Sequence, residues 1–267
     1  MKKFLKVVAL VACMAMLVMS FAACGGEVAN NDDAANAGEG FKMETLNIGT
    51  NAEFPPFEFI DSEVGVVDEF AGIDIEIGKA VAESIGANPV INNMDFDSLL
   101  IALSNNQVDC VIAGMTITPE RQEEVDFSKP YYKATQVMIV PSDSTIAKAA
   151  DIADKQIGVI DGYTGQTCIE DLGYEYNGYK KGADAVLDLA NGKLDVVVID
   201  SSTAEKFIGE NEGLKIVEDA EVFASEEYGI AVKKGNTELL DAINAKIDAM
   251  LADGSINTIC EKYEDAE

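Results

Sequence analysis

One arginine stands alone in a chain whose other strongly basic side chains are all lysine. It is Arg121, in the stretch MTITPERQEEVDFSKPYY (115–132), two residues after Pro119. A planar guanidinium can hold a carboxylate by two parallel hydrogen bonds, whereas a lysine ammonium offers a point charge. The stretch therefore predicts either a carboxylate-binding site or, as the simpler alternative, a surface arginine on a short helix.

The composition excludes several kinds of chemistry. The chain contains no histidine, which removes Ser-His-Asp and Cys-His catalysis and the usual zinc sites, and no metal site is expected. No GxGxxG follows a predicted strand and no GxxxxGK[ST] occurs, so no cofactor is expected either. The formal net charge of −29 would repel phosphates, which argues against DNA or RNA as a partner.

The first residues have the features of an export signal rather than of a folded domain. A basic start precedes an apolar run shorter than a membrane span, so we expect residues 1–23 to be a signal peptide. The run ends FAAC and is followed by GG, which resembles a bacterial lipobox with Phe21 in place of the usual leucine. The resemblance implies lipidation of Cys24 and anchoring to the outer face of the cytoplasmic membrane; the alternative is ordinary cleavage near Ala23. Residues 24–42 have no apolar period and are expected to form a flexible tether.

Three of the five cysteines remain in the mature domain once Cys13 and Cys24 are set aside with the signal and the anchor. An odd number of widely spaced cysteines without a CxxC pair does not indicate a disulfide framework. Buried free thiols are expected at Cys110, Cys168 and Cys260.

Strands and helices alternate in the rest of the chain. The 267 residues suit two compact lobes better than one small core. Alternation of β-rich and amphipathic runs is typical of parallel sheets with crossover helices, and Asp95 or Asp97 is positioned to cap one helix. The expected strands are 45–50, 88–94, 109–114, 155–160, 195–200 and 228–232, and the expected helices are 72–86, 95–106, 183–191, 201–209 and 236–254.

Two segments share one plan. SLLIALSNNQVDCVIAG (98–114) and AVLDLANGKLDVVVID (185–200) each place an apolar helix before an aspartate, Asp109 or Asp195, that opens an apolar strand. This similarity predicts two related α/β lobes. Ligands bind at the carboxyl ends of strands in such sheets, and here these ends read IGTNAEF, VIAGMT, VIDGYTG and VVIDSST. They suit a small polar ligand, although each alone could be an ordinary turn or cap.

Six motifs occur in this order along the chain: IGTNAEFPPFEFID, FAGIDIEIGKAVAESIG, MDFDSLLIAL, VDCVIAGMTITPERQEEVDFSKPYY, GVIDGYTGQT and VVVIDSSTAEKFI. Together they resemble the solute-binding proteins of polar amino-acid ABC importers, which form bacterial solute-binding protein family 3. The similarity runs from about Leu46 to Tyr263. It implies a two-lobed periplasmic-binding-protein-like fold of class α/β, each lobe a mostly parallel sheet flanked by helices. The implied lobes are 43–133 with 228–267, and 134–227, with hinge crossings near 133–136 and 225–229.

The resemblance also implies how the main-chain groups of an amino acid would be held. Arg121 matches the arginine that holds the α-carboxylate, and Asp200 matches the acid that receives the α-ammonium. An amino-acid zwitterion needs such a pair of opposite charges, and burying them is tolerable only if each is paired. The groups implied to assist at the carboxylate are the backbone of Ala113 and Gly114, the side chain of Thr116, and the loop residues Tyr163 and Thr164.

Phe54 and Phe96 match the residues that sandwich the ligand's side chain, although either could be plain core. Asn51 lies where several family members have aspartate, which weakens the case for a cationic ligand, while Glu53 could restore a negative charge. Tyr163 stands where other members have small residues, so its bulk is expected to alter the size of the pocket.

The expected function is binding of a free polar L-amino acid, with a lean to arginine, lysine or glutamine, and its delivery to the permease and ATPase subunits of an ABC importer. The protein is expected to be a non-catalytic monomer outside the cytoplasmic membrane. Two alternatives stay open. A dehydratase-like enzyme on the same fold would need a carboxyl with a raised pKa, and a sensor ectodomain would need a second apolar span, which the sequence does not display.

Overall fold

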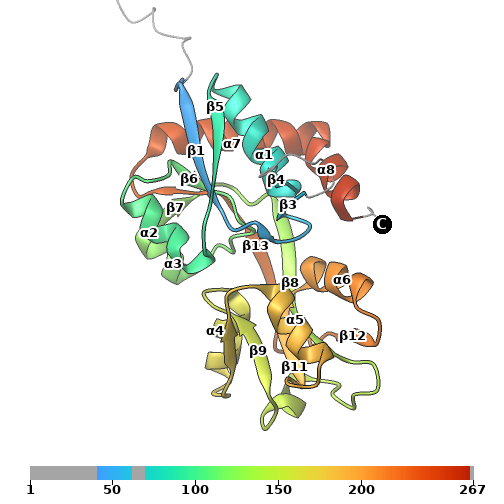
Figure 1. The fold of residues 1–267 in the computed structure, drawn as a ribbon. Coiled ribbons are helices and arrows are strands. Elements are labelled where there is room, and N and C mark those ends of the chain that lie inside the picture. The colour runs from blue at the N-terminus through green and yellow to red at the C-terminus, as the bar shows by residue number, and fades with distance from the viewer. Residues whose placement is uncertain (1–40, 62–69, 265–267) are drawn as a thin grey trace, which may run out of the picture. The chain divides into compact units, whose positions relative to one another are not determined.

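The computed structural model describes residues 41–61 and 70–264. The predicted signal peptide (1–23), nearly all of the predicted tether (24–42) and the lipidation site Cys24 lie outside these residues. Two sheets organise the described part of the chain (Figure 1). We name the elements around the first sheet lobe 1 and those around the second lobe 2.

The sheet of lobe 1 has five strands, and only β14 runs antiparallel to its neighbours. The strand order of this five-stranded sheet is β5 (Asn88–Asn93), β1 (Thr45–Thr50), β6 (Cys110–Val111), β14 (Ala231–Lys233) and β7 (Val125–Phe127). A separate small sheet of β2 (Glu53–Phe54), β3 (Glu58–Ile60) and β4 (Phe70–Ala71) precedes the first helix. The helices are α1 (Ile73–Ser84), the 3-10 turn η1 (Phe96–Ser98), α2 (Leu99–Ser104), α3 (Pro119–Glu124), α7 (Thr237–Asp253) and α8 (Ser255–Glu264).

Lobe 2 repeats this plan with one reversed strand, β8, so the prediction of mostly parallel sheets is confirmed in both lobes. The strand order is β10 (Asn177–Tyr179), β9 (Ile157–Ile160), β11 (Val196–Asp200), β8 (Tyr132–Pro141) and β12 (Leu214–Val217), with β13 (Ser225–Tyr228) beside the first half of β8. The helices are the 3-10 turn η2 (Ala149–Ile152), α4 (Thr164–Asp171), α5 (Gly182–Ala190) and α6 (Ser201–Glu210).

Two antiparallel strands connect the lobes (Figure 1). Strand β8 carries the chain from lobe 1 into the sheet of lobe 2, and β13 returns beside it. Tyr132 of β8 lies opposite Tyr228 of β13, and Thr135 lies opposite Ser225. Backbone hydrogen bonds therefore hold the two connections together, which restricts how the lobes can move against each other.

The two segments that share the helix–aspartate–strand pattern, residues 98–114 and 185–200, occupy equivalent positions in lobe 1 and lobe 2. Asp109 directly precedes β6, and its Oδ2 accepts the backbone N–H of Asn47 at 2.7 Å. Asp195 directly precedes β11, and its Oδ2 accepts the backbone N–H of Gln156 at 2.8 Å. Each aspartate thus ties the start of its strand to the neighbouring parallel strand, which is a physical reason for its recurrence.

The predicted strand 228–232 is wrong as a single element. Tyr228 pairs with β8 as the last residue of β13, whereas Ala231 lies in β14 of the lobe 1 sheet. Gly229 stands at this transition, and its N–H donates to the oxygen of Met115 at 3.0 Å. The chain therefore turns from the connecting ladder into a different sheet within two residues.

Two other boundaries differ from the sequence expectation. The predicted strand 109–114 shortens to Cys110–Val111, and the chain then turns through Gly114, whose φ is +52°. The helix predicted from residue 95 begins as the 3-10 turn η1, without a capping hydrogen bond from Asp95. The side chain of Asp97 instead accepts a hydrogen bond from Lys180 Nζ at 2.6 Å.

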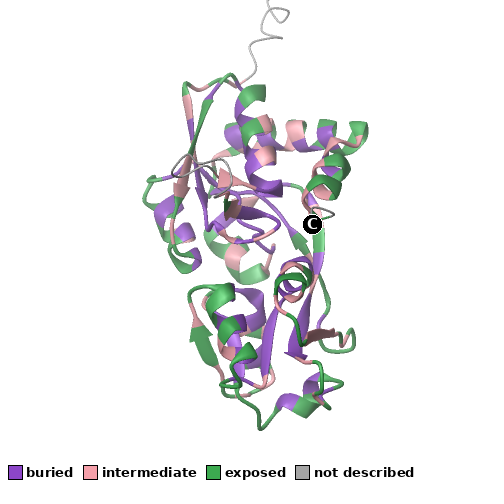
Figure 2. Ribbon diagram, turned by 45° about the vertical axis from the view of Figure 1, so that its right-hand side comes forward, coloured by how far each residue is buried: buried purple, intermediate pink, exposed green. Residues whose placement is uncertain are grey.

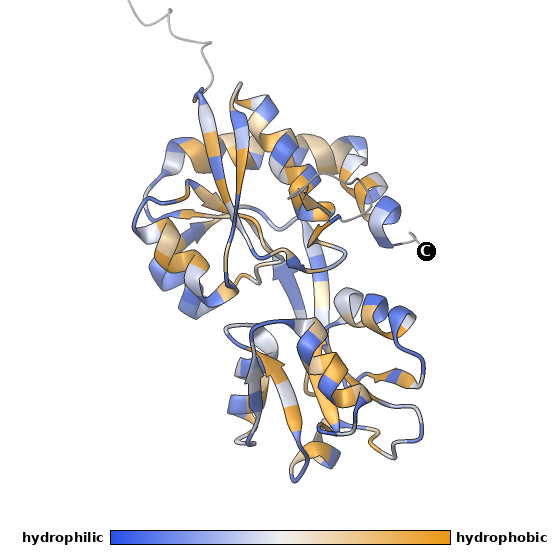
Figure 3. Ribbon diagram, viewed as in Figure 1, coloured by the Kyte–Doolittle hydropathy of each residue, from blue (hydrophilic) through white to orange (hydrophobic). Residues whose placement is uncertain are grey.

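Burial follows hydropathy along the strands. Strands β9 and β11 are buried over their whole length, and both are hydrophobic (Figures 2 and 3). Helices must therefore cover both faces of these strands. The three cysteines expected to be free are free, but only Cys110 is buried, while Cys168 and Cys260 are half-buried.

Candidate functional site

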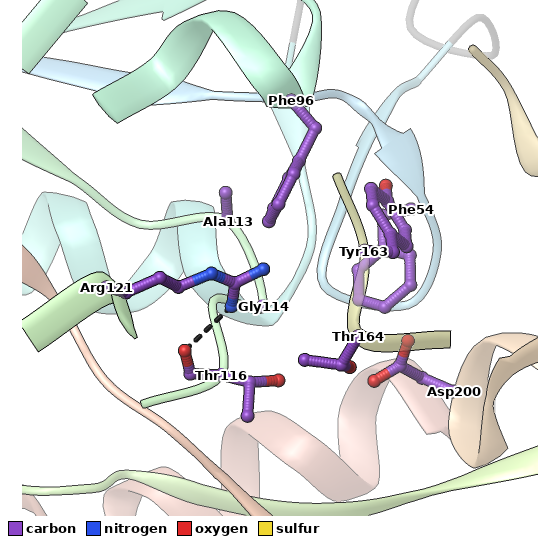
Figure 4. A pocket seen from close by; sticks show the side chains of 9 residues that line it. All are labelled: Phe54, Phe96, Ala113, Gly114, Thr116, Arg121, Tyr163, Thr164 and Asp200. Carbon is purple, nitrogen blue, oxygen red and sulfur yellow. Dashed lines mark hydrogen bonds between the residues drawn. The ribbon is translucent and has the colours of Figure 1, made fainter. Parts of the chain in front are cut away.

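A small cavity with an accessible volume of about 10 Å³ is lined by residues of both lobes (Figure 4). Most of the lining residues end or follow β6, β9 and β11, as expected for sheets of this kind, while Phe54 lies in β2, Phe96 in η1 and Arg121 in α3. The structure brings together nine of the ten residues that the resemblance implied, namely Phe54, Phe96, Ala113, Gly114, Thr116, Arg121, Tyr163, Thr164 and Asp200.

Arg121 is positioned by the first turn of α3. The hydroxyl of Thr118 caps this helix and accepts the N–H of Arg121, and Pro119 occupies the first turn. The guanidinium donates from Nη1 to the oxygen of Thr116 at 2.7 Å and from Nη2 to the oxygen of Gly162 at 2.9 Å. Arg121 is on a short helix, as the simpler alternative had it, but its side chain is half-buried and lines the cavity.

The ring of Phe96 lies beside this cation, with 5.3 Å between the guanidinium carbon of Arg121 and the ring centroid. Burial lowers the pKa of Arg121, and the negative charges of Glu226 and Asp200 oppose that shift. The guanidinium remains charged at any ordinary pH. The cavity therefore presents a fixed positive charge against an aromatic face.

Asp200 supplies the opposite charge. It ends β11, precedes α6 and is buried, and Tyr228 OH donates a short hydrogen bond to its Oδ1. Burial, aided by the negative charge of Glu226, raises the pKa of Asp200 to about 7. A nearby cation would favour its ionised form.

Glu226 is the functional residue that sequence reasoning missed. The hydroxyls of Thr116 and Thr164 each donate to Glu226 Oε2 at 2.8 Å, although the first belongs to lobe 1 and the second to lobe 2. Gln136 Nε2 donates to Thr164 Oγ1 at 3.0 Å and lies 3.4 Å from the same carboxylate oxygen. With their protons committed to Glu226, both hydroxyls can only accept hydrogen bonds from a molecule in the cavity.

A wider groove adjoins the cavity and contains Glu226 in its lining. Cavity and groove share Thr116, Arg121 and Thr164. Glu226 itself does not line the smaller cavity, so its carboxylate acts on the cavity through the two hydroxyls and through its charge.

The side chain of Tyr163 lies between Phe54 and Phe96. The ring centroids of Tyr163 and Phe54 are 5.2 Å apart at 89°, and those of Tyr163 and Phe96 are 4.5 Å apart at 61°. Its hydroxyl donates to Asn51 Oδ1 at 3.1 Å, while Asn51 Nδ2 donates to the oxygen of Met94. Asn51, the tenth implied residue, thus meets the site through Tyr163.

Glu53 does not offer the free negative charge that was considered for it. Its Oε1 lies 2.7 Å from Lys181 Nζ, so the two half-exposed groups form an ion pair. Any preference for a cationic ligand must come from other acids.

A buried carboxyl stabilises the turn at Gly114, a residue that lines the cavity. Asp74 Oδ2 accepts the N–H of Gly114 at 2.6 Å and the hydroxyl of Tyr131 at 2.8 Å. A Cβ on Gly114 would lie 2.5 Å from the ring of Phe54, so only glycine fits this left-handed turn. Burial raises the pKa of Asp74 to about 7, and it raises that of the neighbouring buried Glu58 as well.

Residues 41–61 and 70–264 contain no group of three or more acids or cysteines that could hold a metal ion. Nor does the described part contain a helix with the length and apolar character of a membrane span.

The chain is similar to known proteins over most of its length. The profile of the bacterial extracellular solute-binding proteins, family 3, matches residues 46–266. The chain is 35% identical to the ABC transporter arginine-binding protein 1 of Escherichia coli (82% of this chain, 90% of that protein) and 30% identical to the arginine-binding extracellular protein ArtP of Bacillus subtilis (98% of each). The structure of the arginine-, lysine-, histidine-binding protein ArtJ from Geobacillus stearothermophilus is similar with a TM-score of 0.77, at 32% identity over 84% of this chain and 96% of that one. The chain therefore belongs to the bacterial extracellular solute-binding proteins, family 3.

Proposed function

We propose that the protein binds one free polar amino acid outside the cytoplasmic membrane and delivers it to the permease and ATPase subunits of an ABC importer. One observation carries the proposal: Arg121 and Asp200 bring opposite charges to the lining of one small cavity. The guanidinium would take the α-carboxylate and the carboxylate would take the α-ammonium. The names of two relatives support this reading, since both are arginine-binding proteins and one is named as part of an ABC transporter.

A cationic amino acid suits the site best. Asp200 and Glu226 are both close enough to interact with Arg121, which is the cationic residue in the lining of the cavity, while Glu53 is paired with Lys181. A neutral zwitterion would leave this excess of negative charge uncompensated, whereas the side chain of arginine or lysine would balance it. Two of the relatives described above are arginine-binding proteins by name, which supports the same preference.

The remaining assignments belong to the same proposal. The backbone of Ala113 and Gly114 would assist at the carboxylate. The hydroxyls of Thr116 and Thr164, which the resemblance implied at the carboxylate, donate to Glu226 and would instead accept from the ammonium. Lobe 1 (43–133 and 228–267) and lobe 2 (134–227) would close on the ligand as a monomer, and Cys24 would carry a lipid anchor.

A second candidate is a dehydratase-like enzyme on this fold. The raised pKa of Asp200 favours it, because a general base needs a pKa near the working pH. The family is one of solute-binding proteins, which supports the absence of catalysis. Recovery of each bound amino acid chemically unchanged, measured by mass spectrometry after long incubation, would separate the two.

A thermal-shift screen of the protein against all common amino acids tests the proposal. A ligand at 100 times its Kd adds about 2.7 kcal/mol of apparent stability. Arginine, lysine or glutamine should raise the Tm, and the Asp200→Asn variant should lose the shift. Preference for leucine or valine over every polar amino acid would contradict the proposal.

A further inference from the structure

Tyr163 occupies the aromatic slot that was expected to take a ligand's side chain. Its ring comes from lobe 2 and makes edge contacts with Phe54 and Phe96 of lobe 1. It is 6% exposed, and its hydroxyl donates to Asn51 Oδ1 at the end of the slot. An aromatic body with a polar tip thus fills the space between two phenylalanines.

The end of the slot has a defined polarity. Asn51 uses its Nδ2 to donate to the backbone oxygen of Met94, which leaves its Oδ1 turned toward Tyr163. The slot therefore offers a hydrogen-bond acceptor, and the tyrosine hydroxyl serves as the donor.

The loop that carries Tyr163 is held by the guanidinium at the other end of the site. Gly162 has a φ of +82°. Its oxygen accepts a hydrogen bond from Arg121 Nη2, and its N–H donates to Gln166 Oε1. A carboxylate that takes both Nη groups of Arg121 would compete with the oxygen of Gly162. Ligand capture at Arg121 would thereby loosen the turn that keeps Tyr163 in the slot.

We propose that Tyr163 is a specificity-determining residue that stands in for the ligand's side chain and leaves the slot when a long, donor-tipped side chain enters. This inference rests on the proposed function. The guanidinium of arginine, the ammonium of lysine or the amide of glutamine would replace the tyrosine hydroxyl at Asn51 Oδ1. Amino acids whose side chains cannot reach Asn51 gain nothing that offsets the displaced ring. Tyr163 therefore raises selectivity at the expense of affinity.

Calorimetry on the full chain tests the proposal with the variants Tyr163→Ala and Tyr163→Phe. The control is Tyr174→Ala, because Tyr174 is partly buried against the lobe 2 core and does not line the cavity. Because two ring contacts no longer oppose entry, Tyr163→Ala should bind arginine, lysine and glutamine about tenfold tighter than wild type. Glycine and alanine should change less than about threefold. Tyr163→Phe, which keeps the ring and loses the hydroxyl, should lie between, and Tyr174→Ala should match wild type.

Equal or weaker binding of the long amino acids by Tyr163→Ala would overturn the inference, because the ring would then be a wall on which the ligand packs. If that variant fails to fold, wild type labelled with 3-fluorotyrosine decides the matter. The ¹⁹F resonance assigned through Tyr163→Phe should shift at saturating ligand, and an unchanged resonance would overturn the inference. Failure of every amino acid to bind wild type and Tyr163→Ala would instead overturn the proposed function, and the inference with it.

Discussion

Arg121 of lobe 1 donates a hydrogen bond of 2.9 Å to the carbonyl oxygen of Gly162 in lobe 2. Its other terminal nitrogen donates to the oxygen of Thr116 at 2.7 Å. One planar fork thus joins a backbone group of each lobe while its charge faces the cavity. A lysine ammonium could supply the charge but not the two divergent N–H groups at fixed geometry. This contact explains why the chain uses its one arginine here.

Arg121→Lys should weaken binding of all cognate amino acids together without changing their ranking, because the α-carboxylate is common to them. Loss of one partner of a buried charge pair costs on the order of 2–5 kcal/mol, so Arg121→Ala should bind several hundredfold more weakly. Calorimetry measures the affinity, and circular dichroism on the same samples should give native spectra. Binding by Arg121→Ala as tight as wild type would mean that the carboxylate is held elsewhere.

Binding should depend on pH through Asp200. The pKa of the Asp200 carboxyl is about 7, so below this pH the carboxyl is protonated and must lose its proton before it can pair with an ammonium. The affinity should therefore fall as the pH drops below about 7, by at most about tenfold per pH unit. Asp200→Asn should bind weakly and without this dependence. A pH profile of Kd that is the same in wild type and Asp200→Asn would rule out the assignment.

Glu226→Gln should reduce the preference for cationic ligands. The amide keeps the size of the side chain and can still accept from the hydroxyls of Thr116 and Thr164, but it removes a charge that raises the pKa of Asp200. The ratio of the affinities for arginine and glutamine should fall roughly three- to tenfold. The pH midpoint of binding should move downward as well.

Glu227→Gln is the matched control for Glu226→Gln. The Oε1 atom of the exposed Glu227 lies 3.5 Å from Lys133 Nζ, and Glu227 lines the wider groove but not the cavity. Exposed pairs contribute little, so the control should bind like wild type. An equal effect of both variants would show a general influence of charge rather than a role of the carboxylate at residue 226.

Asp74 should make the folded state less stable as the pH rises. Burial raises its pKa from 3.8 to about 7, so the unfolded chain ionises first. The contribution to stability is complete below pH 3.8 and is lost as the pH rises to about 7. Between these pH values the free energy of unfolding should therefore fall less in Asp74→Asn than in wild type, and the difference should be on the order of a few kcal/mol. Urea unfolding at several pH values measures this, and exposed Asp143→Asn should follow wild type.

The lipid anchor is tested by Cys24→Ala. Each buried methylene contributes about 0.8 kcal/mol, so two acyl chains would hold the protein firmly at a membrane. The variant should move to the soluble fraction, and wild type should incorporate labelled palmitate. Membrane retention of Cys24→Ala, or absence of label in wild type, would disprove the anchor.

The sequence predicted the parts of the site that lie in local motifs. Arg121 follows a capped turn, and Asp200 ends an apolar strand, so each could be recognised within a few residues. Glu226 could not, because its partners Thr116 and Thr164 lie 110 and 62 residues away and belong to different lobes. Residue spacing along the chain does not indicate that Glu226 contacts Thr116 and Thr164 in the folded protein.

The placement of Tyr163 also lay beyond sequence reasoning. A residue type predicts bulk and a hydroxyl, but only the packing of the lobes determines that the ring enters the slot of Phe54 and Phe96. The fold was predicted more fully, because hydrophobic periodicity reports directly on buried strands and helices. Its errors fall at turns such as Gly229, where the chain changes sheets.

Strand β14 has a consequence for the order in which the chain can fold. It lies between β6 and β7 in the lobe 1 sheet, yet it comes from residues that follow the whole of lobe 2. During synthesis, β6 and β7 are made more than 100 residues before the strand that joins them. Lobe 2, a continuous insert, contains its own partners and can fold first, whereas lobe 1 depends on contacts of long sequence separation and must close last. A chain stopped before residue 231 would hold an intact second lobe on an unfinished first one, with two strand edges exposed to aggregation.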